Sequence, residues 1–236
     1  MNTASPIIAE IMSNAGFDFL VVDAEHSAVD IPQTLAIFQA IQAGNQNCVP
    51  IVRLPSNEYW ETKRYLDAGA RGVIAPLINS AEQAQELVRS VKYPPMGERG
   101  VGFGRSHGYG FNFDDYMKSA NEETFICVQI EHVKAIENIE HILSVEGVDA
   151  ILIGPYDLTA SMGITGQFEH SKYLDTLNLI LASCKRHAVL AGIHVVQPDP
   201  GEVLMRIEQG FQLIGYSLDI TMIGNESRKA LDQIRR

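Results

Sequence analysis

Four side chains at the ends of predicted strands could together stabilise an enolate. Glu131 and Asp157 end two successive apolar runs, and carboxylates at neighbouring strand ends suit a hard divalent cation such as Mg²⁺ or Mn²⁺. Arg53 ends another run and offers a planar set of donors to a carboxylate or a developing oxyanion. His26 has a side chain that titrates near neutrality and could act as a general base. Together these groups would favour forming an enolate next to a carboxylate.

Each of these residues also has a simpler interpretation when it is taken alone. Asp157 could cap the N-terminus of a helix, and Arg53 could pair with a surface acid. His26 lies in DAEHSAVD (23–30) and could be a polar residue where a strand reaches the surface. The functional interpretation therefore depends on whether the fold brings the four side chains together.

Seven short apolar runs are typical of strands that are buried on both faces, as in parallel sheets. They are FLVVD (19–23), VPIVRL (49–54), GVIAPLI (72–78), ICVQIE (126–131), AILIGPYD (150–157), LAGIHVV (190–196) and LIGYSLD (213–219). Segments with helical spacing lie between them, and several end on a glycine, the usual signal for a helix C-terminus. This alternation predicts a parallel α/β protein.

A (β/α)₈ TIM barrel fits better than an open doubly wound sheet, because polar residues collect at the C-terminal ends of nearly every run. They are Asp23, His26, Arg53, Glu131, Asp157, His194 and Asp219. In a barrel those ends converge on one mouth, where such enzymes carry their active sites. Only MNTAS precedes the first helix-like run, PIIAEIMSNAG, so we expect the first strand to be truncated.

We expect residues 1–236 to form a single barrel domain with one long Gly-rich loop at about 92–123. A connection of this length is usually functional, as a lid or as a contact between subunits. The loop contains GVGFGR, but this stretch does not open a βαβ unit that continues to an acidic residue. We therefore do not expect a dinucleotide site there.

The bulk composition excludes several classes of partner. A formal charge of −11 argues against nucleic acid and anionic membranes, which both need clustered basic residues. The three cysteines have no CxxC spacing, which argues against a disulfide framework or a zinc site. The sequence also has no run of about 18 apolar residues and no signal-peptide pattern, so we expect a cytoplasmic protein.

Several motifs resemble the HpcH/HpaI aldolases, which are class II, metal-dependent pyruvate aldolases. The likeness extends from about Ala4 to Gly224 and is carried by DAEHSAVD, VRLP with YLDAGARGVIAP, YPPMGERGVG, VQIE and GVDAILIGPYDLTASMG. The resemblance implies a (β/α)₈ barrel of the phosphoenolpyruvate/pyruvate superfamily and a homo-oligomer, either a trimer or a hexamer. Ala24 departs from the glycine that several relatives have.

The resemblance also implies roles for individual residues. Glu131 and Asp157 would bind Mg²⁺, Mn²⁺ or Co²⁺, Gln129 would line that site, and Arg53 would stabilise the enolate oxygen. His26 would be the catalytic histidine with Asp67 as its partner, in place of the adjacent Asp23 or Glu25. The backbone of Gly154, Pro155, Tyr156 and Asp157 would hold the pyruvate carboxylate. His194 falls where some members place an aliphatic residue over the pyruvate methyl group, which could alter the choice of substrate.

The expected reaction is the reversible cleavage of a 4-hydroxy-2-oxo acid to pyruvate and an aldehyde. None of the strand-end positions carries a lysine, which agrees with a metal-dependent rather than an imine-forming aldolase. One alternative is oxaloacetate decarboxylation or related 2-oxo acid lyase chemistry at the same site. A second is a catalytically silent binding or assembly protein with the same fold, which the short N-terminus would favour.

Overall fold

The computed structural model describes residues 1–235 and contains one parallel sheet of seven strands. The strands are β1 (Phe19–Asp23), β2 (Val49–Arg53), β3 (Gly72–Ala75), β4 (Phe125–Ile130), β5 (Ala150–Ile153), β6 (Leu190–Val195) and β7 (Leu213–Tyr216). Each strand pairs with the next one along the chain, so the spatial order is β1-β2-β3-β4-β5-β6-β7. All seven predicted runs are therefore strands, and their predicted order in a parallel sheet is confirmed.

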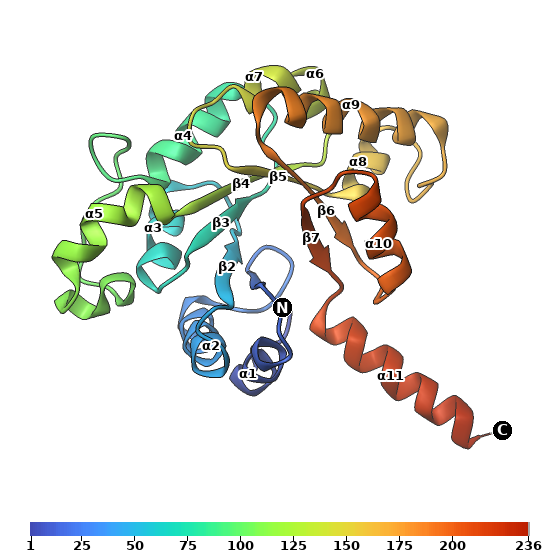
Figure 1. Cartoon of the computed structure of the whole chain (residues 1–236), viewed down its shortest axis with the longest axis horizontal. Helices are drawn as coiled ribbons and strands as arrows, with labels where there is room; N and C mark the ends of the chain where they lie inside the picture. Colours follow the sequence, from blue (N-terminus) through green and yellow to red (C-terminus); the bar gives the residue numbers. More distant parts are fainter. Residues whose placement is uncertain (236) are drawn as a thin grey trace.

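The sheet curls into an incomplete barrel with helices on its outer face (Figure 1). Before β5 these are α1 (Pro6–Asn14), α2 (Ile31–Gly44), α3 (Tyr59–Asp67), α4 (Ala81–Val91), η1 (Arg105–Gly110), α5 (Phe113–Glu123), α6 (Val133–Glu137) and α7 (Ile139–Leu143). After β5 come α8 (Pro155–Ser161), α9 (Ser171–His187), α10 (Pro200–Glu208) and α11 (Asp219–Ile234). The barrel is open between β1 and β7, which do not pair with each other in residues 1–235.

The first residues of the described chain lie at this opening. Met1 lies beside β1, donates its N–H to the carbonyl of Val21 and accepts a hydrogen bond from the N–H of Asp23 at 3.0 Å. The Asp219 carboxylate accepts from the backbone N–H groups of Asn2 and Thr3 at 2.8 and 3.0 Å. The start of the described chain thus takes a single pairing position next to β1.

The side chains inside the barrel form a core separate from the one under the helices. Ile51, Ile74, Cys127 and Ala150 are buried together there, and Leu152 packs against them. Side chains alternate between the two faces of a strand, so residues two positions along from these also point inward. Continuing that alternation past Cys127 brings Gln129 and then Glu131 to the barrel interior at its mouth.

Local sequence explains where several helices begin. Asp30, the last residue of DAEHSAVD, caps α2 by accepting from the backbone N–H of Gln33 at 3.0 Å, and the Gln33 side chain returns the bond. This reciprocal pair is a capping box. Ser80 caps α4 in the same position, by accepting from the backbone N–H of Gln83. Within 92–123 the chain first forms a connection that contains turns but no helix or strand, and then η1 and α5.

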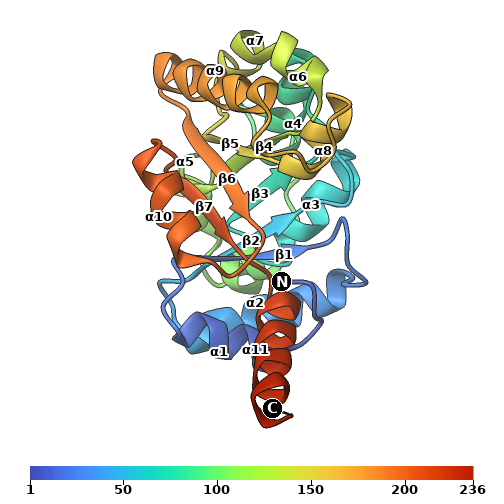
Figure 2. The same ribbon diagram turned by 90° about the vertical axis from the view of Figure 1, so that its right-hand side faces the viewer.

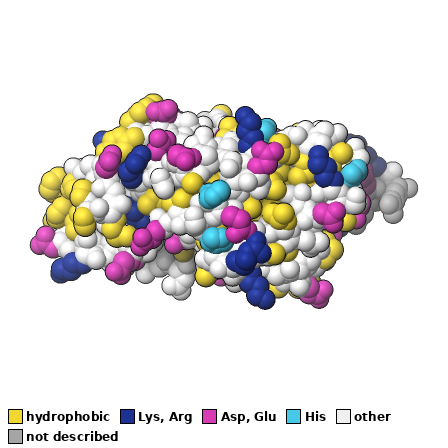
Figure 3. All heavy atoms as spheres, turned by 90° about the horizontal axis from the view of Figure 1, so that it is seen from above, with side chains coloured by type: hydrophobic (Ala, Val, Ile, Leu, Met, Phe, Trp, Pro, Cys, Tyr) yellow, Lys and Arg dark blue, Asp and Glu magenta, His cyan; other side chains and the backbone are white. Residues whose placement is uncertain are grey.

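The last helix, α11, projects away from the barrel (Figure 2). Asp219 is its only buried residue among those described. No helix within residues 1–235 is both long enough and apolar enough to cross a membrane. On the face seen in Figure 3, acidic and basic side chains are interspersed, so this face carries no extended basic surface of the kind nucleic acid requires.

Candidate active site

The C-terminal ends of the strands bring most of the predicted residues to the barrel mouth. Asp23 and Arg53 are register partners at the ends of β1 and β2. The residues that precede Glu131, Gly154 and His194 pair in register across β4, β5 and β6. These three residues therefore lie side by side on the opposite wall. Convergence at the C-terminal face follows from the parallel arrangement of the strands.

Arg53 is held in place by a two-point ion pair with Asp23. The Nε donates to Oδ1 at 2.9 Å and Nη2 donates to Oδ2 at 2.6 Å. Burial pushes the pKa of Asp23 upward, but the hydrogen bonds and the charge of Arg53 outweigh it and lower the pKa. The remaining Nη1 lies 3.3 Å from the Glu25 carboxylate. Asp23 thus fixes the guanidinium, and Glu25 lies against its remaining nitrogen.

His26 lies in the loop after β1, which Asp23 also organises. Asp23 Oδ1 accepts from the backbone N–H groups of Glu25 and His26, each at 3.1 Å. The His26 side chain is 63% exposed, and its Nε2 lies 3.6 Å from the Glu25 carboxylate. Burial raises the pKa of Glu25. The imidazole is thus exposed to solvent, with Glu25 as its nearest charged neighbour.

Glu131 is a buried carboxylate whose two oxygens are both bound. Its Oε1 accepts from the Leu77 N–H at 2.7 Å, and its Oε2 accepts from Gln129 Nε2. The left-handed backbone of Leu77, with φ of 55°, presents that N–H to the carboxylate. The other amide atom, Gln129 Oε1, is buried and has no hydrogen-bond partner among the described residues. The side chains of Gln129 and Glu131 thus form a polar pair with one unused acceptor.

Asp157 is exposed in the first turn of α8, and its carboxylate makes no cap hydrogen bond. The N-cap residue is Gly154, with Pro155 in the first turn, so the simpler interpretation of Asp157 as the helix cap does not apply. The Tyr156 ring packs edge-on against Phe168 at 5.0 Å between centroids. Asp157 is thus available for a ligand.

The donor set at this wall fits a hard divalent cation. Glu131 and Asp157 contribute carboxylate oxygens, and the unpartnered Gln129 Oε1 is a further acceptor in need of a donor or a cation. No group of three or more His, Cys, Asp or Glu side chains suited to a metal occurs within residues 1–235. Two carboxylates with water or substrate oxygens would be typical of Mg²⁺, which usually keeps several water ligands.

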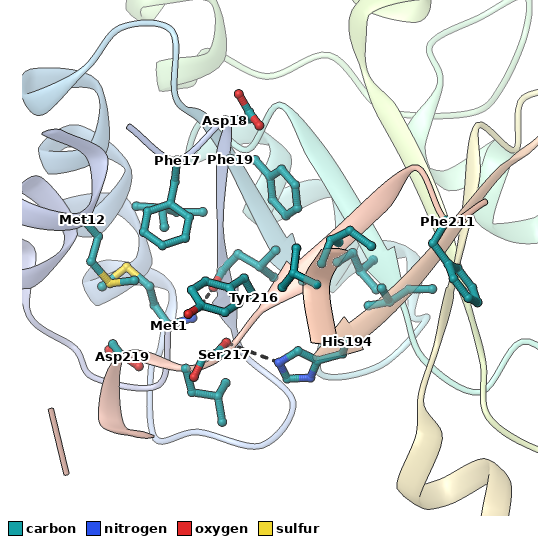
Figure 4. A pocket seen from close by; sticks show the side chains of 18 of the residues that line it. Met1, Met12, Phe17, Asp18, Phe19, His194, Phe211, Tyr216, Ser217 and Asp219 are labelled. Atoms are coloured by element: carbon teal, nitrogen blue, oxygen red, sulfur yellow. Dashed lines mark hydrogen bonds between the residues drawn. The ribbon is translucent and has the colours of Figure 1, made fainter. Parts of the chain in front are cut away.

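A cavity of about 950 Å³ leads from the mouth into the opening between β1 and β7 (Figure 4). Asp23, Arg53 and His194 line its mouth end, and Phe17 and Phe211 line the far end. No lysine lines it in the described chain. The cavity is large enough for a small organic acid and its aldehyde partner.

Asp67 lies away from His26 in the sequence and at the C-terminal end of α3. Its carboxylate accepts from Arg99 Nη2 at 2.8 Å, and the Arg99 side chain is 1% exposed. Arg99 also stacks over the Tyr93 ring at 4.5 Å. No contact between Asp67 and His26 occurs within the described chain, so their pairing stays a prediction.

The structure adds two backbone groups that the sequence did not reveal. The Leu77 N–H binds Glu131, and the Ser217 carbonyl lies 3.3 Å from His194 Nε2. Both residues have positive φ, at 55° and 57°. Neither is a glycine or an asparagine, the residue types that would signal a left-handed backbone, so no sequence signal could have found them.

Comparisons with known proteins agree with this geometry. The family model "HpcH/HpaI aldolase/citrate lyase" matches residues 1–223. A hydroxypyruvate/pyruvate aldolase from Roseobacter denitrificans is 37% identical over 230 residues, which span 97% of this chain and 88% of the relative. A 5-keto-4-deoxy-D-glucarate aldolase from Klebsiella pneumoniae is 34% identical over 233 residues, 99% of this chain and 90% of the relative.

Solved structures show the same fold. The crystal structure of an HpcH/HpaI aldolase/citrate lyase family protein from Burkholderia cenocepacia has a TM-score of 0.94 and 33% identity, and covers 100% of this chain and 93% of its own. An HpcH/HpaI aldolase from Desulfitobacterium hafniense has a TM-score of 0.92 at 35% identity, with 99% and 90% covered. Members of this family generally depend on a divalent metal. The chain belongs to the HpcH/HpaI aldolase/citrate lyase family and is a carbon–carbon lyase of the aldolase type.

Proposed function

We propose that this enzyme reversibly cleaves a 4-hydroxy-2-oxo acid to an aldehyde and a small 2-oxo acid, pyruvate or its hydroxylated analogue. The observation that carries the proposal is the pairing of functional groups at the strand ends: Arg53 is fixed by Asp23 and lies within electrostatic reach of the buried Glu131. The cavity that Arg53 lines contains no lysine among the described residues. The names of the two relatives, which act on pyruvate, hydroxypyruvate and a keto-deoxy sugar acid, support this class of substrate.

Glu131 and Asp157 would hold Mg²⁺, Mn²⁺ or Co²⁺, and a bound metal would supply Lewis-acid polarisation of the oxo and carboxylate oxygens of the donor. The backbone at Gly154–Asp157 would face the donor carboxylate. Arg53 would stabilise the negative charge that develops on the C2 oxygen, because a fixed guanidinium in a partly buried site needs no reorganisation during the reaction. Gln129 would keep the Glu131 carboxylate in position.

His26 would move the proton of the aldol hydroxyl. In the cleavage direction its imidazole takes the proton from the hydroxyl on C4 as the C3–C4 bond breaks. The bonding electrons pass to C3, giving the enolate that Arg53 stabilises and releasing the aldehyde. In the condensation direction the same proton returns to the new hydroxyl.

The oligomer is part of this proposal. Within the described chain Asp67 contacts Arg99 and His26 contacts Glu25, so a pair between Asp67 and His26 would form between two copies. Val101, Phe103, Tyr109 and Phe111 on the neighbouring segment are 54%, 79%, 59% and 93% exposed. So many exposed apolar side chains on one segment are typical of an interface. We therefore expect a homo-oligomer in which this segment contacts another copy.

Shared sites can be tested by mixing two inactive variants. His26→Ala and Asp67→Ala would each lose activity alone, and mixed oligomers would regain part of it if the two side chains meet across subunits. Sedimentation analysis of each sample would report the assembly state. Recovery in a sample that sediments as a monomer would contradict the shared site.

Proton exchange tests the central step without knowledge of the aldehyde. Purified protein would be incubated in D₂O with pyruvate and Mg²⁺, Mn²⁺ or Co²⁺, and the methyl proton signal followed by NMR. We expect metal-dependent loss of the signal, abolished by EDTA and by Glu131→Ala. Glu86→Ala is the matched control, because its side chain is 69% exposed on α4.

Both outcomes are informative. Metal-dependent exchange that Glu131→Ala abolishes and Glu86→Ala leaves intact would establish enolate formation at this site. A folded protein that exchanges no protons with any of the three metals would refute the proposed reaction.

A further inference from the structure

His194 lies between two glycines at the barrel mouth. Its register partner on β7 is Gly215, and on the other side it lies next to Gly154 at the end of β5. A Cβ on Gly215 would lie 3.3 Å from His194 Cδ2, and a Cβ on Gly154 would lie 3.2 Å from Glu131 Oε2. The two glycines therefore leave the imidazole room and leave open the space between it and Glu131.

The Ser217 carbonyl determines which nitrogen of His194 carries the proton. His194 Nε2 lies 3.3 Å from that carbonyl oxygen (Figure 4). A carbonyl only accepts hydrogen bonds, so Nε2 must be the donor and Nδ1 must present a lone pair. The carbonyl is fixed in turn, because the Ser217 N–H binds the Val195 carbonyl at 2.7 Å and Oγ binds the Val196 carbonyl at 3.1 Å.

The imidazole is kept neutral by its surroundings. Burial lowers the pKa of His194, against the opposing effect of the bond to Ser217, and the positive charge of Arg53 adds to the lowering. Nδ1 therefore remains an acceptor at neutral pH. A role as the base that takes a proton from carbon is disfavoured, because the resulting imidazolium would lie half-buried and near the positive charge of Arg53.

The orientation of the ring directs this acceptor toward the substrate. Cδ2 faces Gly215 on β7, and Nδ1 is on the opposite edge of the imidazole, which is turned away from β7 toward the β5 side of the mouth. No protein group donates to Nδ1 within residues 1–235. Val21, Leu152 and Ile214 make much of the adjoining cavity apolar. If the bound substrate placed a methyl group against Nδ1, this acceptor would lose water without gaining a donor, and binding would be weaker. A methyl group is therefore a poor match for Nδ1.

We propose that His194 selects a donor that carries a hydroxyl group on C3, by accepting a hydrogen bond from that hydroxyl at Nδ1. The inference rests on the proposed function, in which the carboxylate and the C2 oxygen of the donor face the metal ligands and Arg53. C3 is then the part of a three-carbon donor left to meet His194. Hydroxypyruvate is the simplest such donor, and pyruvate differs from it only in lacking the hydroxyl.

The test compares the two donors in one assay. The metal-dependent exchange of the C3 protons in D₂O would be measured for hydroxypyruvate and for pyruvate, and kcat/KM determined for each. A site that hydrogen-bonds a substrate hydroxyl discriminates strongly against the analogue without it. We expect a preference for hydroxypyruvate that falls at least about tenfold in His194→Leu. His194→Asn, which keeps an acceptor near the position of Nδ1, should restore part of it.

A control variant and a second measurement distinguish the role of His194 from the proposed aldolase reaction. His141→Leu, an exposed histidine on α7, should leave the donor ratio unchanged, and thermal unfolding would confirm that every variant is folded. Calorimetric titration of the metal-loaded protein with each donor would report the preference even if no exchange occurs. If no C3 proton exchange occurred but hydroxypyruvate still bound more tightly than pyruvate, the proposed reaction would be refuted and the role of His194 supported.

Two results would overturn the inference. An unchanged donor ratio in His194→Leu, in exchange and in binding, would show that the imidazole does not contact the distinguishing hydroxyl. An equal loss for both donors would show a role common to them, such as proton transfer or packing.

Discussion

Replacing Asp23 with asparagine tests whether the Arg53 ion pair organises the mouth. The carboxylate has only 5% of its side-chain surface exposed, and the guanidinium side chain has 22%. The variant keeps an oxygen for Arg53 Nε but places an amide NH₂ opposite Nη2, where the carboxylate oxygen lies at 2.6 Å. One charge-assisted hydrogen bond thus becomes a contact between two donors, and Arg53 loses its counter-charge.

The expected cost follows from these contacts. A hydrogen bond to a charged group contributes about 1.5–3 kcal/mol, and removing one partner of a buried ion pair costs about 3–5 kcal/mol. Because Arg53 retains some exposure to water, we expect Asp23→Asn to lower the free energy of unfolding by about 3 kcal/mol. At about 2–4 °C per kcal/mol for a chain of this size, the thermal midpoint should fall by about 6–12 °C.

The pH dependence has a defined sign. The pKa of Asp23 is lower in the folded protein than its ordinary value, so its contribution to stability is present above about pH 4. That contribution is lost as the pH falls through the lowered folded pKa. The difference in stability between the wild type and Asp23→Asn should therefore be constant from about pH 8 to 5 and shrink below about pH 4.

Scanning calorimetry at a fixed protein concentration would measure both effects. Asp115→Asn is the matched control, because its side chain is 87% exposed on α5, and it should change stability by less than about 0.5 kcal/mol. The proton-exchange rate should fall in Asp23→Asn as Arg53 loses its orientation. A thermal midpoint within about 2 °C of the wild type at pH 7, or a difference that does not shrink in acid, would refute the reasoning.

Three further variants test other contacts. Arg99→Lys should lower the thermal midpoint nearly as much as Arg99→Ala. The buried guanidinium binds Asp67 at 2.8 Å and also stacks on the Tyr93 ring, and an ammonium group cannot make both contacts. A lysine variant as stable as the wild type would contradict this. Tyr173→Phe should raise the free energy of unfolding in urea by up to about 1 kcal/mol, because the buried Tyr173 hydroxyl has no hydrogen-bond partner among the described residues. A clear loss of stability would mean that this hydroxyl is hydrogen-bonded. Gly154→Ala should stay folded but bind Mn²⁺ more weakly, as measured by calorimetry. The added Cβ would lie 3.1 Å from the Cβ of Glu131 and would displace this carboxylate. An unchanged Mn²⁺ affinity would mean that the metal binds elsewhere.

The sequence alone was sufficient to predict the fold and most of the residues at the barrel mouth. Strands buried on both faces must be apolar along their whole length, so all seven could be recognised, and parallel strands carry their polar ends to one face. Asp23, Arg53, Glu131 and His194 could therefore be placed at a common mouth from their positions at the ends of these runs. Their predicted chemical roles rest on the resemblance and on the experiments above.

Tertiary structure decided how those side chains are bound to one another. Asp23, which the sequence left as a neighbour of His26, is the partner of Arg53, and Asp67 is bound to Arg99 within its own chain. The sequence alone cannot reveal such pairings, because the fold could bring any of several basic side chains to each carboxylate. The direction of the Ser217 carbonyl depends on a left-handed backbone that no residue type signals. Residue types and their spacing determine which groups reach the mouth, whereas hydrogen-bond partners depend on backbone directions that exist only once the barrel has folded.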